Sequence, residues 1–155
     1  MLTRALLLLL VLAAPAAWAE TYQGKVVRVS DGDTLTLLVD RKQIKVRLTE
    51  IDAPETHQAF GQRSRQSLAE MCAAQPATVR ASGKDRYGRV LGRVECKGVD
   101  ANTEQVRRGM AWVYDRYVTD RSLYALQNEA RAAHLGLWAD QAPTAPWLWR
   151  AQHKH

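Results

Sequence analysis

Residues 22–48 read YQGKVVRVSDGDTLTLLVDRKQIKVRL, in three segments where apolar and polar side chains tend to alternate. Alternation with a period of two is the pattern of a half-buried β-strand. We therefore predict strands over Tyr22–Val29, Thr34–Val39 and Ile44–Leu48. The turns between them contain Ser30-Asp31-Gly32-Asp33 and Asp40-Arg41-Lys42-Gln43, residue types that favour turns. Strands joined by short turns form a meander, and such a sheet has to curl or pack on a helix.

A helix is predicted next. His57–Ala74 contains no proline, lies between Pro54 and Pro76, and carries one face at helical spacing: Phe60, Ser64, Leu68, Met71 and Cys72. A hairpin follows, from Ala77–Ala81 and Val90–Val94 around a polar loop. Five strands with a helix between the third and the fourth is the order of an OB-fold, a small Greek-key barrel.

Two more helices follow the predicted barrel. A short helix over residues 102–108 ends at Gly109, and a last helix begins near Thr119-Asp120 and ends at Gly136. The inward positions of the last helix are Leu123, Leu126, Ala130 and Ala133. The fold class predicted from these patterns is α+β: a five-stranded OB-fold β-barrel with about three helices.

The first residues have the composition of a secretory signal peptide. Arg4 precedes the apolar run Ala5–Ala14, and Ala17-Trp18-Ala19 offers a small-x-small cleavage site. The run is shorter than the roughly 20 residues that a membrane span requires. We predict a signal peptide over residues 1–19, one domain over 20–140 and a C-terminal tail over 141–155, with an uncleaved N-terminal anchor as the alternative. The mature protein would be exported to the periplasm or the medium and would not remain attached to the membrane.

Charge and cysteine content add weaker indications. The net charge of +6 suits a polyanionic partner without proving one. An even number of cysteines in an exported chain favours a disulfide between Cys72 and Cys96, although two separate buried thiols remain an alternative. No cluster of histidine and cysteine suggests zinc.

The residues with chemical potential are polar and follow the predicted strands. Taken singly, Asp33, Arg47, Asp52, Glu55 and Arg89 are each explained by a turn or a solvated surface. Taken together, two carboxylates and a backbone carbonyl could hold a calcium ion, and an arginine fork suits a phosphate. A glutamate three residues beyond Asp52 could take a proton from a water near the metal.

These residues lie in motifs that resemble, in order, those of the staphylococcal nuclease family. The motifs are Asp31-Gly32-Asp33-Thr34, Val46-Arg47-Leu48, Ile51-Asp52-Ala53-Pro54-Glu55 and Asp85-Arg86-Tyr87-Gly88-Arg89. Gly109-Met110-Ala111-Trp112-Val113-Tyr114 and Gly136-Leu137-Trp138 are similar to later landmarks of the family. The resemblance extends from Tyr22 to about Trp138, and it implies an OB-fold nuclease that hydrolyses DNA and RNA with little sequence preference to 3′-phosphate products.

The resemblance also implies roles for single residues. It assigns Ca²⁺ to Asp33, Asp52 and the carbonyl of Ala53, where the family often has threonine. It makes Glu55 the general base, while Arg47 and Arg89 hold the scissile phosphate.

Nucleic-acid contacts are implied for Arg86, Tyr87 and Tyr117. A second tyrosine of the family falls on Asp115, so either Tyr114 replaces it or that contact is absent.

Two other classes of function remain open. One is a non-catalytic OB-fold protein that binds single-stranded nucleic acid, and the other is a structural protein whose calcium site stiffens a loop. All five residues Asp33, Arg47, Asp52, Glu55 and Arg89 are present, which favours the nuclease. We expect a monomer, because nothing in the sequence asks for a partner chain. The sequence does not distinguish DNA from RNA as the natural substrate, endo- from exonuclease action, or Ca²⁺ from Mg²⁺.

Overall fold

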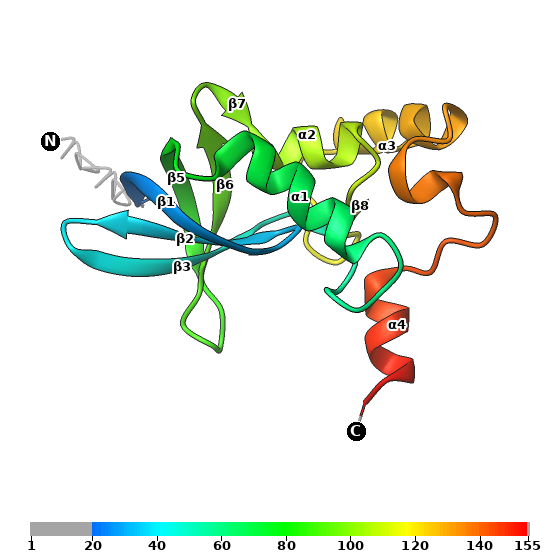
Figure 1. Cartoon of the computed structure of the whole chain (residues 1–155), viewed down its shortest axis with the longest axis horizontal. Coiled ribbons are helices and arrows are strands. Elements are labelled where there is room, and N and C mark those ends of the chain that lie inside the picture. The colour runs from blue at the N-terminus through cyan, green and yellow to red at the C-terminus, as the bar shows by residue number, and fades with distance from the viewer. Residues whose placement is uncertain (1–19, 155) are drawn as a thin grey trace, which may run out of the picture.

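A computed structural model describes residues 20–154, so the predicted signal peptide lies outside the described residues. The long strands are β1 (Thr21–Asp31), β2 (Thr34–Val39), β3 (Lys42–Leu48), β5 (Pro76–Lys84) and β6 (Val90–Cys96). They are ordered β3-β2-β1-β5-β6, and a parallel pairing of β3 with β6 closes them into a barrel. Helix α1 (Gly61–Cys72) comes between the third and fourth long strands in the sequence and lies beside the barrel (Figure 1). The OB-fold prediction is therefore confirmed.

The remaining elements extend one side of the barrel. Short strands β4 (Ile51–Asp52) and β8 (Trp112–Val113) pair with each other, and β7 (Val99–Asp100) pairs with β6. The helices are α2 (Ala101–Arg107), α3 (Leu123–Ala132), the 3₁₀ helix η1 (Gly136–Ala139) and α4 (Pro146–Gln152). In Figure 1, α2 and α3 follow α1 along one side, whereas α4 lies below them near the C-terminus. The predicted tail thus contains a helix that sequence patterns did not show.

Helix α1 begins four residues later than predicted, at Gly61 instead of His57. Phe60 has a left-handed φ of 65°, and the side chain of Gln58 accepts a hydrogen bond from the Glu55 N–H, so the segment before α1 is a turn. A Cβ on Gly61 would lie 1.9 Å from the Glu55 carbonyl oxygen. The turn therefore packs too closely against this position for any side chain.

The start and one inward position of the last helix were also predicted wrongly. Helix α3 begins at Leu123, and the N–H groups of Thr119 and Asp120 before it donate to the side chain of Glu50. Leu123 and Ala130 are buried as predicted, and Leu126 is half-buried. Ala133 lies beyond the end of α3 and is exposed.

The core fills the barrel and the space between the barrel and α1. Leu35, Leu37, Val46 and Val79 are fully buried, together with Leu68 of α1. Cys72 at the end of α1 and Cys96 at the end of β6 form a disulfide, so the helix is covalently attached to the barrel. Within the described residues, no helix is long and apolar enough to cross a bilayer.

Candidate active site

Asp33 is fixed by the turn between β1 and β2. The Asp31 carboxylate accepts a hydrogen bond from the Asp33 N–H at 3.0 Å. A Cβ on Gly32 would lie 1.8 Å from Ser64 Oγ and 2.8 Å from the Ala53 Cβ, so only glycine fits this close approach. The Ala53 N–H donates to Asp33 Oδ2 at 2.6 Å. The turn therefore holds the Asp33 carboxylate against the main chain that follows β4.

Arg47 connects the two candidate metal-binding carboxylates. Thr34 pairs with Arg47 in the β2–β3 ladder, which places Asp33 beside the end of β3. Arg47 Nε lies 3.2 Å from Asp33 Oδ1, and its Nη2 lies 3.1 Å from Asp52 Oδ1. Its Nη1 donates to the carbonyl oxygens of Leu48 and Ile51. The guanidinium thus links the ends of β3 and β4 as well as the two carboxylates.

A second arginine, which sequence reasoning missed, reaches the same site from α4. Arg150 Nη2 lies 2.7 Å from Asp52 Oδ2, and its Nη1 donates to Glu55 Oε1 at 2.7 Å and to Asp52 Oδ1 at 3.2 Å. The only sequence signal was indirect. Trp147 and Trp149 in the tail are residue types that tend to dock on a folded domain, but nothing in the sequence indicated where.

The two aspartates are almost inaccessible to solvent, with Asp33 5% and Asp52 1% exposed. Burial raises the pKa of Asp33 to about 8; Arg47 and the Ala53 N–H oppose the rise, and the charges of Asp31 and Asp52 add to it. A buried carboxylate in this situation is stabilised by a nearby cation. Positive charge at this site therefore relieves an unfavourable burial of negative charge.

The donor atoms fit a hard cation. Among residues 20–154 no group of three or more His, Cys, Asp and Glu side chains is placed to hold a metal ion. A metal here would have two carboxylates, Asp33 and Asp52, as its side-chain ligands, with main-chain and water oxygens completing the shell. The N–H of Ala53 contacts Asp33. An oxygen-only set with open positions suits Ca²⁺ or Mg²⁺ and does not suit zinc.

Arg89 lies apart from the carboxylates at the level of side chains. Its Nε pairs with Asp85 Oδ2 at 2.7 Å, and Asp85 is its only ionic partner in the described part of the chain. The backbone is nevertheless close to the site, because Val90 and Leu91 pair with Val46 and Arg47 across the parallel β3–β6 contact. The structure thus brings together Asp33, Arg47, Asp52 and Glu55, whereas Arg89 reaches only the neighbouring strand.

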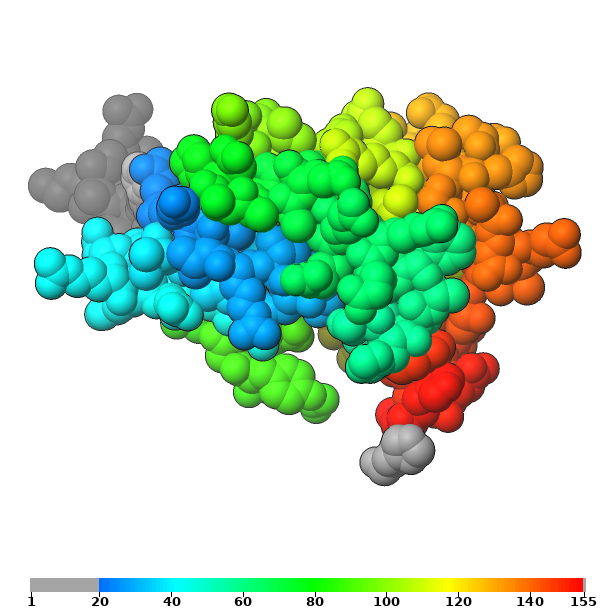
Figure 2. Space-filling view, in the orientation of Figure 1, coloured from blue at the N-terminus to red at the C-terminus, as the bar shows by residue number. Residues whose placement is uncertain are grey.

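The predicted nucleotide contacts lie on two separate exposed surfaces. Arg86 and Tyr87 are in the β5–β6 loop, where the Tyr87 ring is 68% exposed and has the Arg86 and Arg89 guanidiniums 4.8 and 5.6 Å from its centroid. Tyr117 is 55% exposed and packs edge-on against Tyr114 at 5.0 Å. Figure 2 shows the tip of the β5–β6 hairpin and the C-terminal segment both projecting at the lower edge of the molecule.

Comparison with known proteins identifies the family. A family model described as staphylococcal nuclease homologue matches residues 45–140. The chain belongs to the staphylococcal nuclease family. An uncharacterized endonuclease of Escherichia coli is 44% identical over 145 residues, covering 93% of this chain and 94% of that protein. A micrococcal nuclease of Shigella flexneri is 43% identical, covering 94% of this chain and 89% of that protein.

Membership of the staphylococcal nuclease family gives the site its chemical class. The chain is a hydrolase of phosphodiester bonds, and its substrates are nucleic acids. An uncharacterized endonuclease of Haemophilus influenzae is also 44% identical, over 99% of this chain and 86% of that protein. In this staphylococcal nuclease homologue, the carboxylate and arginine cluster at the ends of β2, β3 and β4 is therefore the candidate active site.

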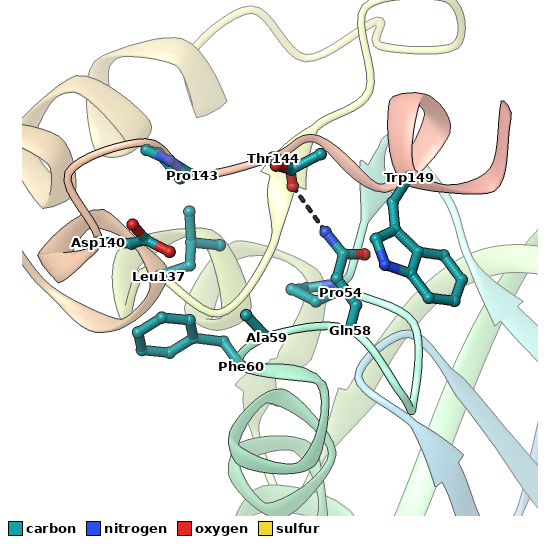
Figure 3. A pocket seen from close by; sticks show the side chains of 9 residues that line it. All are labelled: Pro54, Gln58, Ala59, Phe60, Leu137, Asp140, Pro143, Thr144 and Trp149. Carbon is teal, nitrogen blue, oxygen red and sulfur yellow. Dashed lines mark hydrogen bonds between the residues drawn. The ribbon is translucent and has the colours of Figure 1, made fainter. Parts of the chain in front are cut away.

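The C-terminal segment is firmly attached beside this cluster of the staphylococcal nuclease homologue. Trp147 stacks on Tyr114 with ring centroids 5.5 Å apart and an interplanar angle of 6°. Gln58 Nε2 donates to the Thr144 carbonyl oxygen at 2.7 Å (Figure 3). A cavity of about 160 Å³ lies between this segment and the turn before α1, lined by Pro54, Gln58, Ala59, Phe60, Leu137, Asp140, Pro143, Thr144 and Trp149. Contacts on both sides of this cavity hold α4 in place.

Proposed function

We propose that the protein is a calcium-dependent endonuclease that hydrolyses DNA and RNA with little sequence preference and leaves 3′-phosphate ends. The observation that carries the proposal is the convergence of the buried Asp33 and Asp52 on one guanidinium, that of Arg47. A protein that only binds nucleic acid has no need for two carboxylates at a phosphate site, because they repel the phosphate unless a cation intervenes.

The metal would be held by Asp33, Asp52 and the carbonyl oxygen of Ala53. A Ca²⁺ ion there would supply positive charge to a phosphate oxygen and to the water that attacks phosphorus. The burial of both aspartates and their shared contact with Arg47 support this assignment. Members of the family generally use Ca²⁺, and the experiment therefore compares Ca²⁺ with Mg²⁺ directly.

The chain's own residues would bind the phosphate and move the proton. Glu55 is the general base in this proposal, and its side chain, 35% exposed, can take a proton from a solvent water. Arg47 is fixed by four acceptors, so its charge is already oriented when substrate binds. Arg89 would leave Asp85 and turn toward the phosphate from the adjacent strand β6. Arg86, Tyr87 and Tyr117 would contact the nucleotides without reading their sequence.

The proposal includes export of the protein. Residues 1–19 would be removed as a signal peptide, and the Cys72–Cys96 disulfide supports an oxidising compartment, the periplasm or the medium. The remaining domain and C-terminal segment would act as a monomer.

The test is cleavage of labelled single-stranded DNA, double-stranded DNA and RNA in Ca²⁺, Mg²⁺ or a chelator. Product ends that accept a 5′-labelled linker only after treatment with a 3′-phosphatase would establish the polarity of cleavage. Glu55→Gln and Arg89→Gln should each lose at least about 100-fold in kcat. Arg107→Gln is the matched control, because within residues 20–154 this exposed arginine on α2 has Glu104 as its only ionic partner. Binding of nucleic acid without cleavage in every ion would favour the OB-fold binding protein instead.

A further inference from the structure

Helix α4 places a positive charge on the carboxylates that the proposed function assigns to the metal and to the base. We infer that Arg150 is a stand-in cation that competes with Ca²⁺ for Asp52, and that α4 is a lid which the metal loosens. The inference rests on the proposed function, because it requires Asp52 to be a metal ligand. It adds a role for a segment outside the predicted domain and for a residue outside every motif of the sequence.

Each oxygen of the Asp52 carboxylate already accepts a hydrogen bond from a guanidinium. Its Oδ2 accepts from Arg150 at 2.7 Å, and its Oδ1 accepts from both Arg47 and Arg150 at 3.1 and 3.2 Å. A calcium ligand lies 2.3–2.6 Å from the ion. A guanidinium nitrogen and a divalent ion on the same carboxylate oxygen would repel each other strongly at this separation. One of the two arginines therefore has to move when the metal binds.

Arg150 is the arginine that can move. Its side chain is 38% exposed, whereas that of Arg47 is 13% exposed and is bound on four sides. The charges agree with this choice. Once a bound divalent cation has ionised Asp33, the carboxylates Asp33, Asp52 and Glu55 would carry three negative charges against four positive ones, two from the arginines and two from the ion. Release of Arg150 would bring the net charge of the site close to zero.

The remaining contacts of the segment show that Arg150 is presented by a docked helix and does not reach the site as an isolated side chain. Ala145 and Pro146 are buried, and Trp147 packs on Tyr114 and edge-on against Trp112 at 5.6 Å. The ring of Trp147 covers one face of Tyr114, an aromatic surface beside the exposed Tyr117. In its docked position the lid therefore occupies both the cation position and an aromatic face next to it.

Competition has a reciprocal consequence. If Arg150 lowers the affinity for Ca²⁺, then Ca²⁺ lowers the stability of the docked α4 by the same factor. The lid would close the site when Ca²⁺ is scarce and open it when Ca²⁺ is abundant. Two independent measurements can therefore detect the same coupling, one on the metal and one on the helix.

The first measurement is the affinity for Ca²⁺ alone, by isothermal titration calorimetry. Arg150→Gln should bind Ca²⁺ about tenfold more tightly than the wild type. Arg150→Lys keeps the charge without the two-pronged geometry, and its affinity for Ca²⁺ should lie between those of the wild type and Arg150→Gln. Lys154→Gln removes the same charge from an exposed position of the same segment and should stay within about twofold of the wild type. Equal affinities of Arg150→Gln and the wild type would overturn the inference and leave the proposed nuclease function untouched.

The second measurement is hydrogen exchange of peptides that cover residues 143–153. Addition of Ca²⁺ should accelerate exchange in α4 of the wild-type protein and should have a smaller effect in Arg150→Gln, in which the coupling is already lost. Unchanged or slower exchange in the wild type would contradict the lid. Failure of both proteins to bind Ca²⁺, together with cleavage that a chelator does not affect, would overturn calcium dependence and with it the inference.

Discussion

Arg47 donates through Nη2 to Asp52 Oδ1 at 3.1 Å, across the turn that connects β3 to β4. The same guanidinium pairs with Asp33, so one side chain contacts both buried aspartates, while Arg150 supplies a second positive charge to Asp52. Because removal of one partner of a buried ion pair leaves uncompensated charge, this relationship links the stability of the site to its activity.

Arg47→Gln should lower kcat by about 100-fold or more, because the substitution removes an oriented positive charge that the proposed function assigns to the phosphate. It should also lower the free energy of unfolding in the absence of metal by about 3 kcal/mol. Steady-state cleavage and urea denaturation with a chelator measure the two effects. A variant that retains more than a third of the wild-type kcat would show that Arg47 only organises the turn.

Glu50 should make the fold sensitive to acid. Burial acts to raise the pKa of Glu50, but hydrogen bonds from the N–H of Asp120, from the hydroxyl and N–H of Thr119 and from Arg93 outweigh burial and lower the pKa to about 2 from 4.5. The folded state thus binds a proton less readily than the unfolded state. The resulting stability is fully present above about pH 4.5 and is lost as the pH falls toward 2.

Glu50→Gln should therefore lower the free energy of unfolding by about 2 kcal/mol at pH 7, since one charged acceptor of several hydrogen bonds is lost. The difference from the wild type should shrink between pH 4.5 and pH 2. Urea denaturation across this range measures both quantities. A difference that stays constant with pH would mean that packing, and not the charge of Glu50, stabilises this region.

The Cys72–Cys96 disulfide closes a loop with a sequence separation of 24 residues. Its removal by Cys72→Ala with Cys96→Ala should lower the free energy of unfolding by about 3 kcal/mol, since the unfolded chain regains conformational freedom. The kcat of the folded enzyme should change by less than about twofold, because the bond joins α1 to β6 away from the carboxylates. A dithiothreitol-independent melting temperature of the wild type would argue against the bond.

Tyr87 should contribute to substrate binding and not to stability. Tyr87→Ala should raise KM about tenfold, because stacking of a base on an exposed aromatic ring contributes about 1–3 kcal/mol. The melting temperature should be unchanged, as the ring is 68% exposed. Tyr87→Phe keeps the ring and should have a KM close to that of the wild type. An unchanged KM in Tyr87→Ala would remove this residue from the nucleotide-binding surface.

Local patterns were sufficient to predict the barrel and the core of its site. Strand β2 has the predicted bounds, Thr34–Val39, because alternation and turn residues define both of its ends. Asp33 and Arg47 come from neighbouring strands of one meander, so short-range pairing brings them together, and Asp52 follows Arg47 within five residues. Glu55 also follows within a few residues, which is why its proximity to Asp52 was predictable.

Long-range contacts account for what the sequence did not show. Arg150 contacts Asp52 although 98 positions separate them in the sequence. No periodic pattern indicates where a short terminal helix will dock. Glu50 accepts hydrogen bonds from the N–H groups of Thr119 and Asp120, the residues predicted to begin the last helix, whereas α3 begins at Leu123. In both cases the two partners lie far apart in sequence, so local propensity could not anticipate the contact.

The parallel contact between β3 and β6 has a consequence for folding kinetics. Val46 can pair with Val90 only after β1, β2, β5 and α1 have brought the two strands together, so barrel closure should be a late and slow step. Until then β3 and β6 both present unpaired backbone groups along an edge. We therefore expect intermediates formed during refolding at high protein concentration to aggregate through these two strands.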